Sequence, residues 1–246
     1  MSFKVGGDPE FFILRDGTPV SAHDLLPGSK EEPYPLEHGD VQVDGMAGEV
    51  NIRPSSSAEE FEYNVRAVFS DVRKMLPKHF DIAFKPSVEF LDSTLATVPD
   101  SQKELGCSPD FNAYSGLMNE SPMLELKKVP NLRSAGGHIC VGWGENFDKK
   151  DASHVLDCES FIKHIDPIYR SFSTLWDRDQ RRAMLYGRPG AYRATAFGVE
   201  YRTPSNAWVA HPKMYPFIFA LAENTMLHMM GEPGKELTFK SEWIDG

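Results

Sequence analysis

The stretch VQVDGMAGEVNIRP, residues 41–54, has the pattern of strand, turn and strand. In residues 49–53 polar side chains alternate with aliphatic ones, and side chains two positions apart lie on the same face of a strand. Asp44-Gly45 is a typical turn sequence, and Pro54 ends the second run. The stretch therefore predicts a hairpin with one apolar face and one face that carries chemical groups.

Further short runs predict strands, and apolar side chains at helical spacing predict helices. Strands are expected over residues 3–5, 11–14, 19–20, 81–91, 137–142 and 197–203. Helices are expected over residues 57–76, 159–176 and 212–230, and residues 24–40 and 100–135 are expected to be mostly loop. Regular alternation of strand and helix is missing. The pattern therefore predicts an α+β fold with a mainly antiparallel sheet, in a single domain over residues 1–246.

Three local signals refine these expectations. Ser57 and Glu60 have the spacing of a capping box, which marks the start of the first helix. Pro86 lies within the run at 81–91 and implies an edge position or a bulge there. The Gly-Gly-Asp-Pro sequence at residues 6–9 predicts a break between the first two strand pieces, and residues 15–17 predict a hairpin turn.

The composition is that of an ordinary globular protein, and the formal net charge is -10. This charge argues against a broad surface for nucleic acid or an anionic membrane, because the long-range field repels polyanions. The three cysteines have no CxxC spacing, so neither a disulfide framework nor a cysteine zinc site is indicated. The first residues lack the apolar run of a signal peptide, and a cytoplasmic location is expected.

Carboxylates and one histidine recur on the polar faces of the expected strands. Asp8 and Glu10 are two residues apart, and Glu49, His138 and Glu200 each alternate with aliphatic or aromatic neighbours. If these strands are adjacent, the five side chains converge. Buried carboxylates that lie together repel one another unless they are protonated or bridged by cations, and Mg²⁺ or Mn²⁺ prefers such oxygen ligands. The pattern therefore suggests a metal site.

Each piece also has an ordinary structural explanation. Alternating Glu and Arg on a strand face often form cross-strand ion pairs. A single histidine such as His138 is more often structural than a ligand, and Asp8-Pro9-Glu10 alone is more often a turn.

Arginines gather in the segment RRAMLYGRPGAYR, residues 181–193, and Arg202 follows shortly after. Guanidinium groups in a glycine-punctuated segment of an acidic protein suit phosphate or carboxylate, since each planar fork can bind either group through two hydrogen bonds. The alternative is a solvated loop with surface ion pairs, which contribute little stability.

Five blocks occur in the order found in the glutamine synthetase and glutamate–cysteine ligase superfamily: GGDPEFF, DGMAGEVNIRP, AGGHICVG, YGRPGAYR and GVEYRTPSN. Across residues 6–206 the chain resembles the small, phage-associated amidoligase branch of that group. The resemblance implies a curved antiparallel sheet of about six strands with helices on its outer face. It also implies an ATP-dependent carboxylate–amine ligase that uses Mg²⁺, with Mn²⁺ as an alternative, and acts in a host bacterial cytoplasm if phage-encoded.

The same resemblance implies roles for individual residues. Asp8 would serve a metal site near the nucleotide phosphates together with His138 and Glu200, while Glu10 and Glu49 would serve a second site near the acceptor. The phosphate-contacting arginines would be Arg193 and Arg202, with Arg182 and Arg188 as further candidates; Arg193, Arg202 and Glu200 would form the catalytic set. The partners would be small-molecule or peptide substrates that supply a carboxylate and an amine.

The chain departs from the glutamine synthetase pattern at Val41, where those enzymes have another glutamate. Asp44 is a possible replacement, and a site with fewer ligands is the alternative. The polar, turn-rich segment 107–114 is expected to lie on the substrate side. Two other functions share these motifs: a guanidino-kinase-like phosphotransferase and a catalytically inactive binding module.

Overall fold

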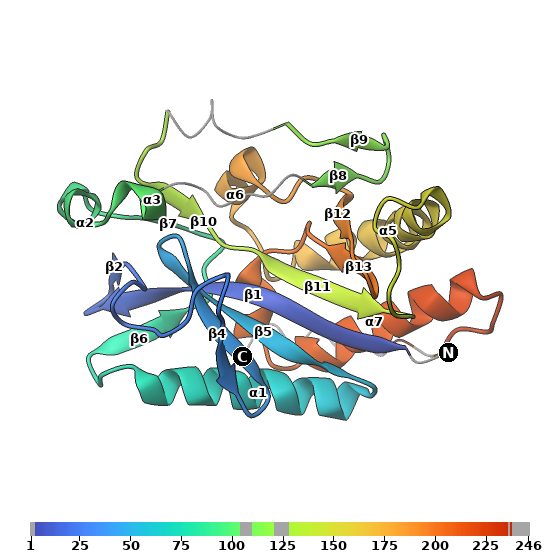
Figure 1. The fold of residues 1–246 in the computed structure, drawn as a ribbon, viewed down its shortest axis with the longest axis horizontal. Helices are drawn as coiled ribbons and strands as arrows, with labels where there is room; N and C mark the ends of the chain where they lie inside the picture. The colour runs from blue at the N-terminus through green and yellow to red at the C-terminus, as the bar shows by residue number, and fades with distance from the viewer. Residues whose placement is uncertain (1–2, 104–109, 121–127, 236, 238–246) are drawn as a thin grey trace.

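The computed structural model describes residues 3–103, 110–120, 128–235 and 237. Its central strand is β1 (Lys4–Arg15), which pairs antiparallel with β5 (Ala47–Ser55) on one side and β11 (Gly137–Gly142) on the other (Figure 1). Within the described residues the main sheet has eleven strands in the order β3-β4-β5-β1-β11-β13-β12-β8-β9, and β2 and β6 also pair with β1. The fold is α+β with a mainly antiparallel sheet, as predicted.

The remaining strands of this sheet are β2 (Thr18–Val20), β3 (Tyr34–Leu36), β4 (Gly39–Asp44), β6 (Phe80–Ala83), β8 (Phe111–Asn112), β9 (Leu117–Met118), β12 (Ala191–Ala194) and β13 (Gly198–Tyr201). A second sheet consists of β7 (Ser87–Glu89) and β10 (Leu132–Ser134). The sheet has more than the expected six or so strands because short strands form in segments expected to be loops, such as β3, β8 and β9.

Three long helices cover the apolar face of the main sheet: α1 (Ala58–Met75), α5 (Ala152–Ser173) and α7 (Met214–Met229). Their buried side chains form one core with the aliphatic residues of the strands, and burial of each large apolar side chain contributes about 1.5–3 kcal/mol. The short helices are α2 (Asp92–Thr97), α3 (Asp100–Lys103), α6 (Gln180–Leu185) and the 3-10 helix η1 (Asn206–Ala210). In Figure 1, α2, α3 and α6 lie on the side of the sheet opposite α1. None of the helices that the structure describes has the length and apolar character needed to cross a membrane.

The start of α1 follows the predicted capping pattern. Ser57 Oγ accepts a hydrogen bond from the Glu60 backbone N–H at 3.2 Å, and Glu60 Oε2 accepts one from Ser56 N–H at 2.7 Å. These bonds satisfy backbone donors that have no partner within the helix. The third predicted helix also forms, with slightly shorter bounds.

Three predicted boundaries are wrong. The first strand does not break at residues 6–9, because β1 runs through this segment and pairs with β11 as far as Pro9. The run at 81–91 divides at Pro86 into β6 and β7, which belong to different sheets. Helix α5 begins at Ala152, seven residues before position 159, because Asp151 caps its first turn by accepting from His154 N–H at 3.0 Å.

Close packing, and not an unusual backbone angle, requires glycine at position 137. A Cβ at this position would lie 2.2 Å from the Ser205 carbonyl oxygen and 2.6 Å from Trp208 Nε1. The Trp208 indole N–H donates to the Gly137 carbonyl at 2.9 Å, so η1 is pressed directly against the strand that carries His138. A side chain at Gly137 would separate these two elements.

We therefore expect Gly137→Ala to lower the free energy of unfolding by about 1–3 kcal/mol, the usual cost of overpacking a tight interior. Gly142→Ala in the same strand is the matched control, since its Cβ would meet neighbours only at 3.6 Å or beyond. Urea unfolding of both variants tests this expectation, and equal stabilities would contradict it.

Candidate active site

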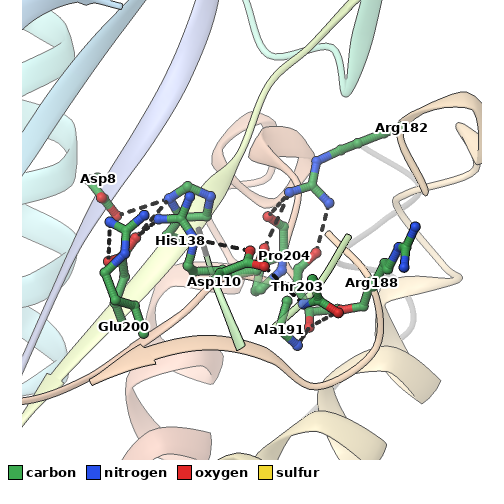
Figure 2. A network of polar contacts seen from close by, with 12 residues as sticks. Asp8, Asp110, His138, Arg182, Arg188, Ala191, Glu200, Thr203 and Pro204 are labelled. Atoms are coloured by element: carbon green, nitrogen blue, oxygen red, sulfur yellow. Dashed lines mark hydrogen bonds and ion pairs between the residues drawn. The ribbon is translucent and has the colours of Figure 1, made fainter. Parts of the chain in front are cut away.

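Three predicted ligands meet where β1, β11 and β13 lie side by side. Asp8 is the direct cross-strand partner of His138, whose Nδ1 lies 3.5 Å from Asp8 Oδ1 and 3.4 Å from Glu200 Oε1 (Figure 2). One ligand atom from each of these three residues lies within 4.8 Å of the other two. His138 and Glu200 are 4% and 5% exposed, so this group is largely removed from solvent.

A second group of carboxylates lies on the same face of the sheet. Glu10 on β1 is the cross-strand partner of Glu49 on β5, and Asp44 at the end of β4 joins them, with ligand atoms within 4.8 Å of one another. Val41 is on the opposite face, fully buried in the helix-covered core, so this position faces away from the site. Asp44 is the third carboxylate of this group, and its role as a metal ligand stays a prediction.

The imidazole of His138 is held between Gly136 and Tyr186. A Cβ on Gly136 would lie 2.4 Å from His138 Nε2, and the rings of His138 and Tyr186 have centroids 5.8 Å apart. This packing turns Nδ1 toward Asp8 and Glu200 and leaves Nε2 buried without a hydrogen-bond partner among the described residues. Gly136, in the glycine-rich block before the histidine, thus leaves room for the His138 ring.

Burial and mutual repulsion shift the pKa values of three glutamates upward. Burial, reinforced by Asp44, raises the pKa of Glu10 to about 7. Burial, reinforced by Asp8, raises the pKa of Glu200 to about 8 and that of Glu49 well above its ordinary value. Each of these groups resists ionisation in the folded chain.

The other two predicted ligands shift in the opposite direction. Burial and the nearby charge of Arg202 lower the pKa of His138 to about 4, so the imidazole is neutral at physiological pH. Burial acts to raise the pKa of Asp8, but His138, Arg202 and Arg193 outweigh it and hold that pKa below its ordinary value. A neutral imidazole beside carboxylates is a donor set that fits a divalent cation such as Mg²⁺ or Mn²⁺.

Two of the predicted arginines border the first group of ligands. Arg193 Nη1 lies 3.1 Å from Glu200 Oε2, and Arg202 Nη1 contacts Glu200 Oε1. Arg202 also reaches Asp110, with 3.4 Å between Nε and Oδ2. Both guanidinium groups line the same cavity as Asp8 and His138, so positive charge lies directly beside these ligands.

The other two arginines are not brought to the carboxylates. Arg182 is 4% exposed and donates to the carbonyl oxygens of Ala135 at 2.9 Å, Thr203 at 2.8 Å and Pro204 at 2.8 Å. It therefore joins the chain before β11 to the chain after β13. Arg188 is exposed, and Figure 2 shows its side chain directed away from Asp8, His138 and Glu200. Phosphate binding by either arginine therefore stays a prediction.

Asp8 lines two cavities. The smaller, of about 250 Å³, contains the second carboxylate group together with His138, Arg193 and Arg202. The larger, of about 1050 Å³, is lined by Glu200 and by glycines and aromatic side chains that include Gly6, Gly7, Trp143 and Phe197. Known small-molecule sites occupy about 300–1,000 Å³, so the larger cavity has the size for a cofactor.

Several residues of the smaller cavity were not predicted. Lys30 Nζ lies 2.8 Å from Asp44 Oδ1, and Gln42 is the cross-strand partner of Glu49. Arg133 and Tyr186 also line this cavity. In the sequence Gln42 shares the two-residue spacing of Asp44, which was a usable signal, whereas nothing local marks Lys30 or Arg133.

The expected substrate-side segment 107–114 lies only partly within the described residues, and Cys107 lies outside them. Asp110 is buried against Arg202, and Tyr114 O–H donates to Asp166 Oδ2 at 2.8 Å. The described part of the segment is thus held by one side-chain contact to α5 and by another to Arg202, which borders the first group of ligands.

Comparisons with known proteins found no matching family model and no matching curated protein. Among solved structures, a GmaS–ADP complex has a TM-score of 0.44 at 13% identity, covering 97% of this chain and 58% of that one. A structure described as a novel glutamine synthase homolog has a TM-score of 0.38 at 12% identity, covering 99% of this chain and 60% of that one. The chain therefore spans about three fifths of their length, and these scores carry no function from them to it.

The raised pKa values predict a loss of stability with rising pH when no divalent ion is present. Glu10 and Glu200 bind protons in the folded chain with pKa values of about 7 and about 8, against an ordinary value of 4.5. Their contribution is fully present below about pH 4.5 and is lost as pH rises through about 7 to 8. Thermal unfolding in a chelating buffer should show the fall, and Mg²⁺ or Mn²⁺ should oppose it.

Glu10→Gln and Glu200→Gln should each flatten this profile, because an amide stays neutral at every pH in the range. Glu59→Gln, at an exposed position on α1, is the control and should keep the wild-type slope. Identical profiles for the wild-type chain and both site variants would refute the electrostatic account.

Proposed function

We propose that this chain is an ATP-dependent carboxylate–amine ligase that forms an amide or peptide-like bond through an acyl phosphate. The observation that carries the proposal is the meeting of two three-residue ligand groups on one sheet face, with Arg193 and Arg202 against Glu200. Acids, an imidazole and guanidinium groups so placed suit the transfer of a phosphoryl group, which depends on positioning and on charge neutralisation. The five sequence blocks that resemble glutamine synthetases supply these residues.

The two cavities offer separate places for the nucleotide and for the other two substrates in the proposed reaction. ATP would occupy the larger cavity with its phosphates toward Asp8 and Glu200, and the acid and amine would occupy the smaller one. Asp8, His138 and Glu200 would hold one divalent ion, and Glu10, Asp44 and Glu49 a second. Such ions offset the negative charge of phosphoryl oxygens and orient them.

The chain's own groups then have distinct tasks in the proposed reaction. A carboxylate oxygen of the acid attacks the γ-phosphorus and ADP leaves; the amine nitrogen attacks the acyl carbon, phosphate leaves and the nitrogen loses a proton. Arg193 and Arg202 would offset charge on the transferred phosphoryl oxygens. His138, with its pKa lowered to about 4, would act as a neutral ligand rather than as an acid. No nucleophilic side chain is needed, so Cys140 has no part in this chemistry.

The test is turnover of ATP in the presence of Mg²⁺ or Mn²⁺ and pooled amino acids or cell-wall peptides. We expect ADP release and a product whose mass is that of acid plus amine minus water. Glu10→Gln and Glu200→Gln should lower the rate at least about a hundredfold, the scale of loss for a group that stabilises transition-state charge.

Glu59→Gln is again the control and should retain the wild-type rate, since its side chain is exposed on α1. A phosphorylated product with no amide would instead identify a phosphotransferase. ATP turnover that persists in both site variants would refute the assignment of these carboxylates.

A further inference from the structure

His164 on α5 and His228 in the last turn of α7 form a pair of exposed histidines away from the candidate active site. Their ring centroids lie 4.8 Å apart, with an angle of 55° between the ring planes. The two helices pack against each other, and the rings of Phe172 and Phe217 meet between them at 5.2 Å between centroids (Figure 1). The pair thus spans two elements that are already held together, so little further ordering is needed to present both rings to one ligand.

A hydrogen bond fixes which nitrogen of His164 can bind a ligand. Its Nδ1 lies 2.7 Å from the carbonyl oxygen of Ser160, one turn earlier on α5. A carbonyl oxygen only accepts, so Nδ1 carries the proton and the lone pair of the neutral ring is on Nε2. Histidines that bind metal ions have this same arrangement, in which the nitrogen that does not bind the metal donates to a carbonyl or a carboxylate.

The separation of the two rings is that of imidazoles bound to one ion. An imidazole nitrogen binds Zn²⁺ at about 2.0–2.1 Å, and the ring centre lies about 1.1 Å beyond that nitrogen. Two rings on one ion at an angle of about 90–109° therefore have centres about 4.5–5.2 Å apart. The observed 4.8 Å falls within this range, so the rings of His164 and His228 already have the spacing that a shared ion requires.

Two imidazoles select a different class of cation from the carboxylates of the candidate active site. Imidazole suits Zn²⁺, Ni²⁺ and Cu²⁺, whereas Mg²⁺ and Ca²⁺ prefer oxygen ligands. Among the described residues, no third histidine, cysteine or carboxylate completes a three-residue ligand group with this pair. Water would fill the remaining coordination positions, since both rings are exposed.

We propose that His164 and His228 bind one ion of this class, Zn²⁺, Ni²⁺ or Cu²⁺, which links α5 to α7. The proposal is independent of the ligase function. Helix α5 also carries the buried Asp166, which accepts a hydrogen bond from Tyr201 O–H at 2.8 Å. The ion therefore stabilises a helix that is bonded to β13, the strand that carries Glu200.

Isothermal titration calorimetry with Zn²⁺ tests the site. The full chain is first freed of metal by chelation and dialysis, and the buffer contains millimolar Mg²⁺ to occupy carboxylate sites. His164→Gln and His228→Gln should each bind one Zn²⁺ ion fewer than the wild-type chain, or bind it at least about tenfold more weakly, because the second imidazole of a chelating pair binds intramolecularly. Zn²⁺ bound at the candidate active site is common to all these proteins and cancels in the comparison.

His79→Gln is the matched control. His79 is exposed and its ring contacts Phe80 at 4.4 Å between centroids, so this variant also removes one surface histidine but leaves the pair intact. It should bind Zn²⁺ as the wild-type chain does. Thermal unfolding gives a second measurement: excess Zn²⁺ should raise the midpoint of the wild-type chain and of His79→Gln by more than that of either site variant, because a ligand of the folded chain stabilises it.

A wild-type chain that binds no Zn²⁺ overturns the inference, as do Zn²⁺ binding and thermal shifts that are the same in the wild-type chain and in both site variants. A loss confined to one of the two site variants also overturns it, since the histidines then do not share an ion. An equal loss in His79→Gln has the same consequence, because Zn²⁺ would then bind surface histidines singly.

Discussion

The packing of like charges on one face of β1 is the constraint on which the rest of the structure depends. Asp8 and Glu10 lie two residues apart on this strand, and the neighbouring strands add Glu49 and Glu200 beside them. Repulsion and burial raise the pKa values of three of these four carboxyl groups. Such an arrangement opposes folding, and burial of the apolar face of the same strands under three long helices offsets this cost.

The register of β11 against β1 places His138 opposite Asp8 on the polar face of the sheet. A shift of one residue along β11 would move His138 to the helix-covered face and bring Ile139 to the carboxylates, because side chains alternate along a strand. Three contacts oppose that shift. The Ser205 carbonyl packs against Gly137 and the imidazole of His138 packs against Gly136, where a side chain would leave no room. Arg182 donates hydrogen bonds to carbonyls before β11 and after β13. Arg182 thus acts on the site through the backbone, although its position in an arginine-rich segment suggested a ligand contact.

The sequence predicted those features that depend on neighbours along the chain. Alternation in residues 49–53 and around His138 and Glu200 identified the polar face, and the capping box located the start of α1. What it could not predict depends on contacts distant in sequence. Lys30 reaches Asp44 from a segment expected to be loop, and Arg133 enters the smaller cavity from a strand of the second sheet. No local periodicity encodes such meetings, since they arise only when separate elements pack.

Which side chains of β4 reach the second ligand group depends on the face of the strand on which they lie. Val41 lies in the core, so a carboxylate there would be buried among aliphatic side chains and would contribute nothing to the second ligand group. Gln42 and Asp44 occupy the polar face of the same strand, and Asp44 lies at the hairpin, where it meets both Glu10 and Lys30. The third carboxylate of this group is thus supplied from the turn, together with a lysine that offsets part of its charge. The second ligand group thus sets three carboxyl groups against one lysine, whereas the first sets two carboxyl groups and a neutral imidazole against two arginines. The second group therefore has the greater need of added positive charge.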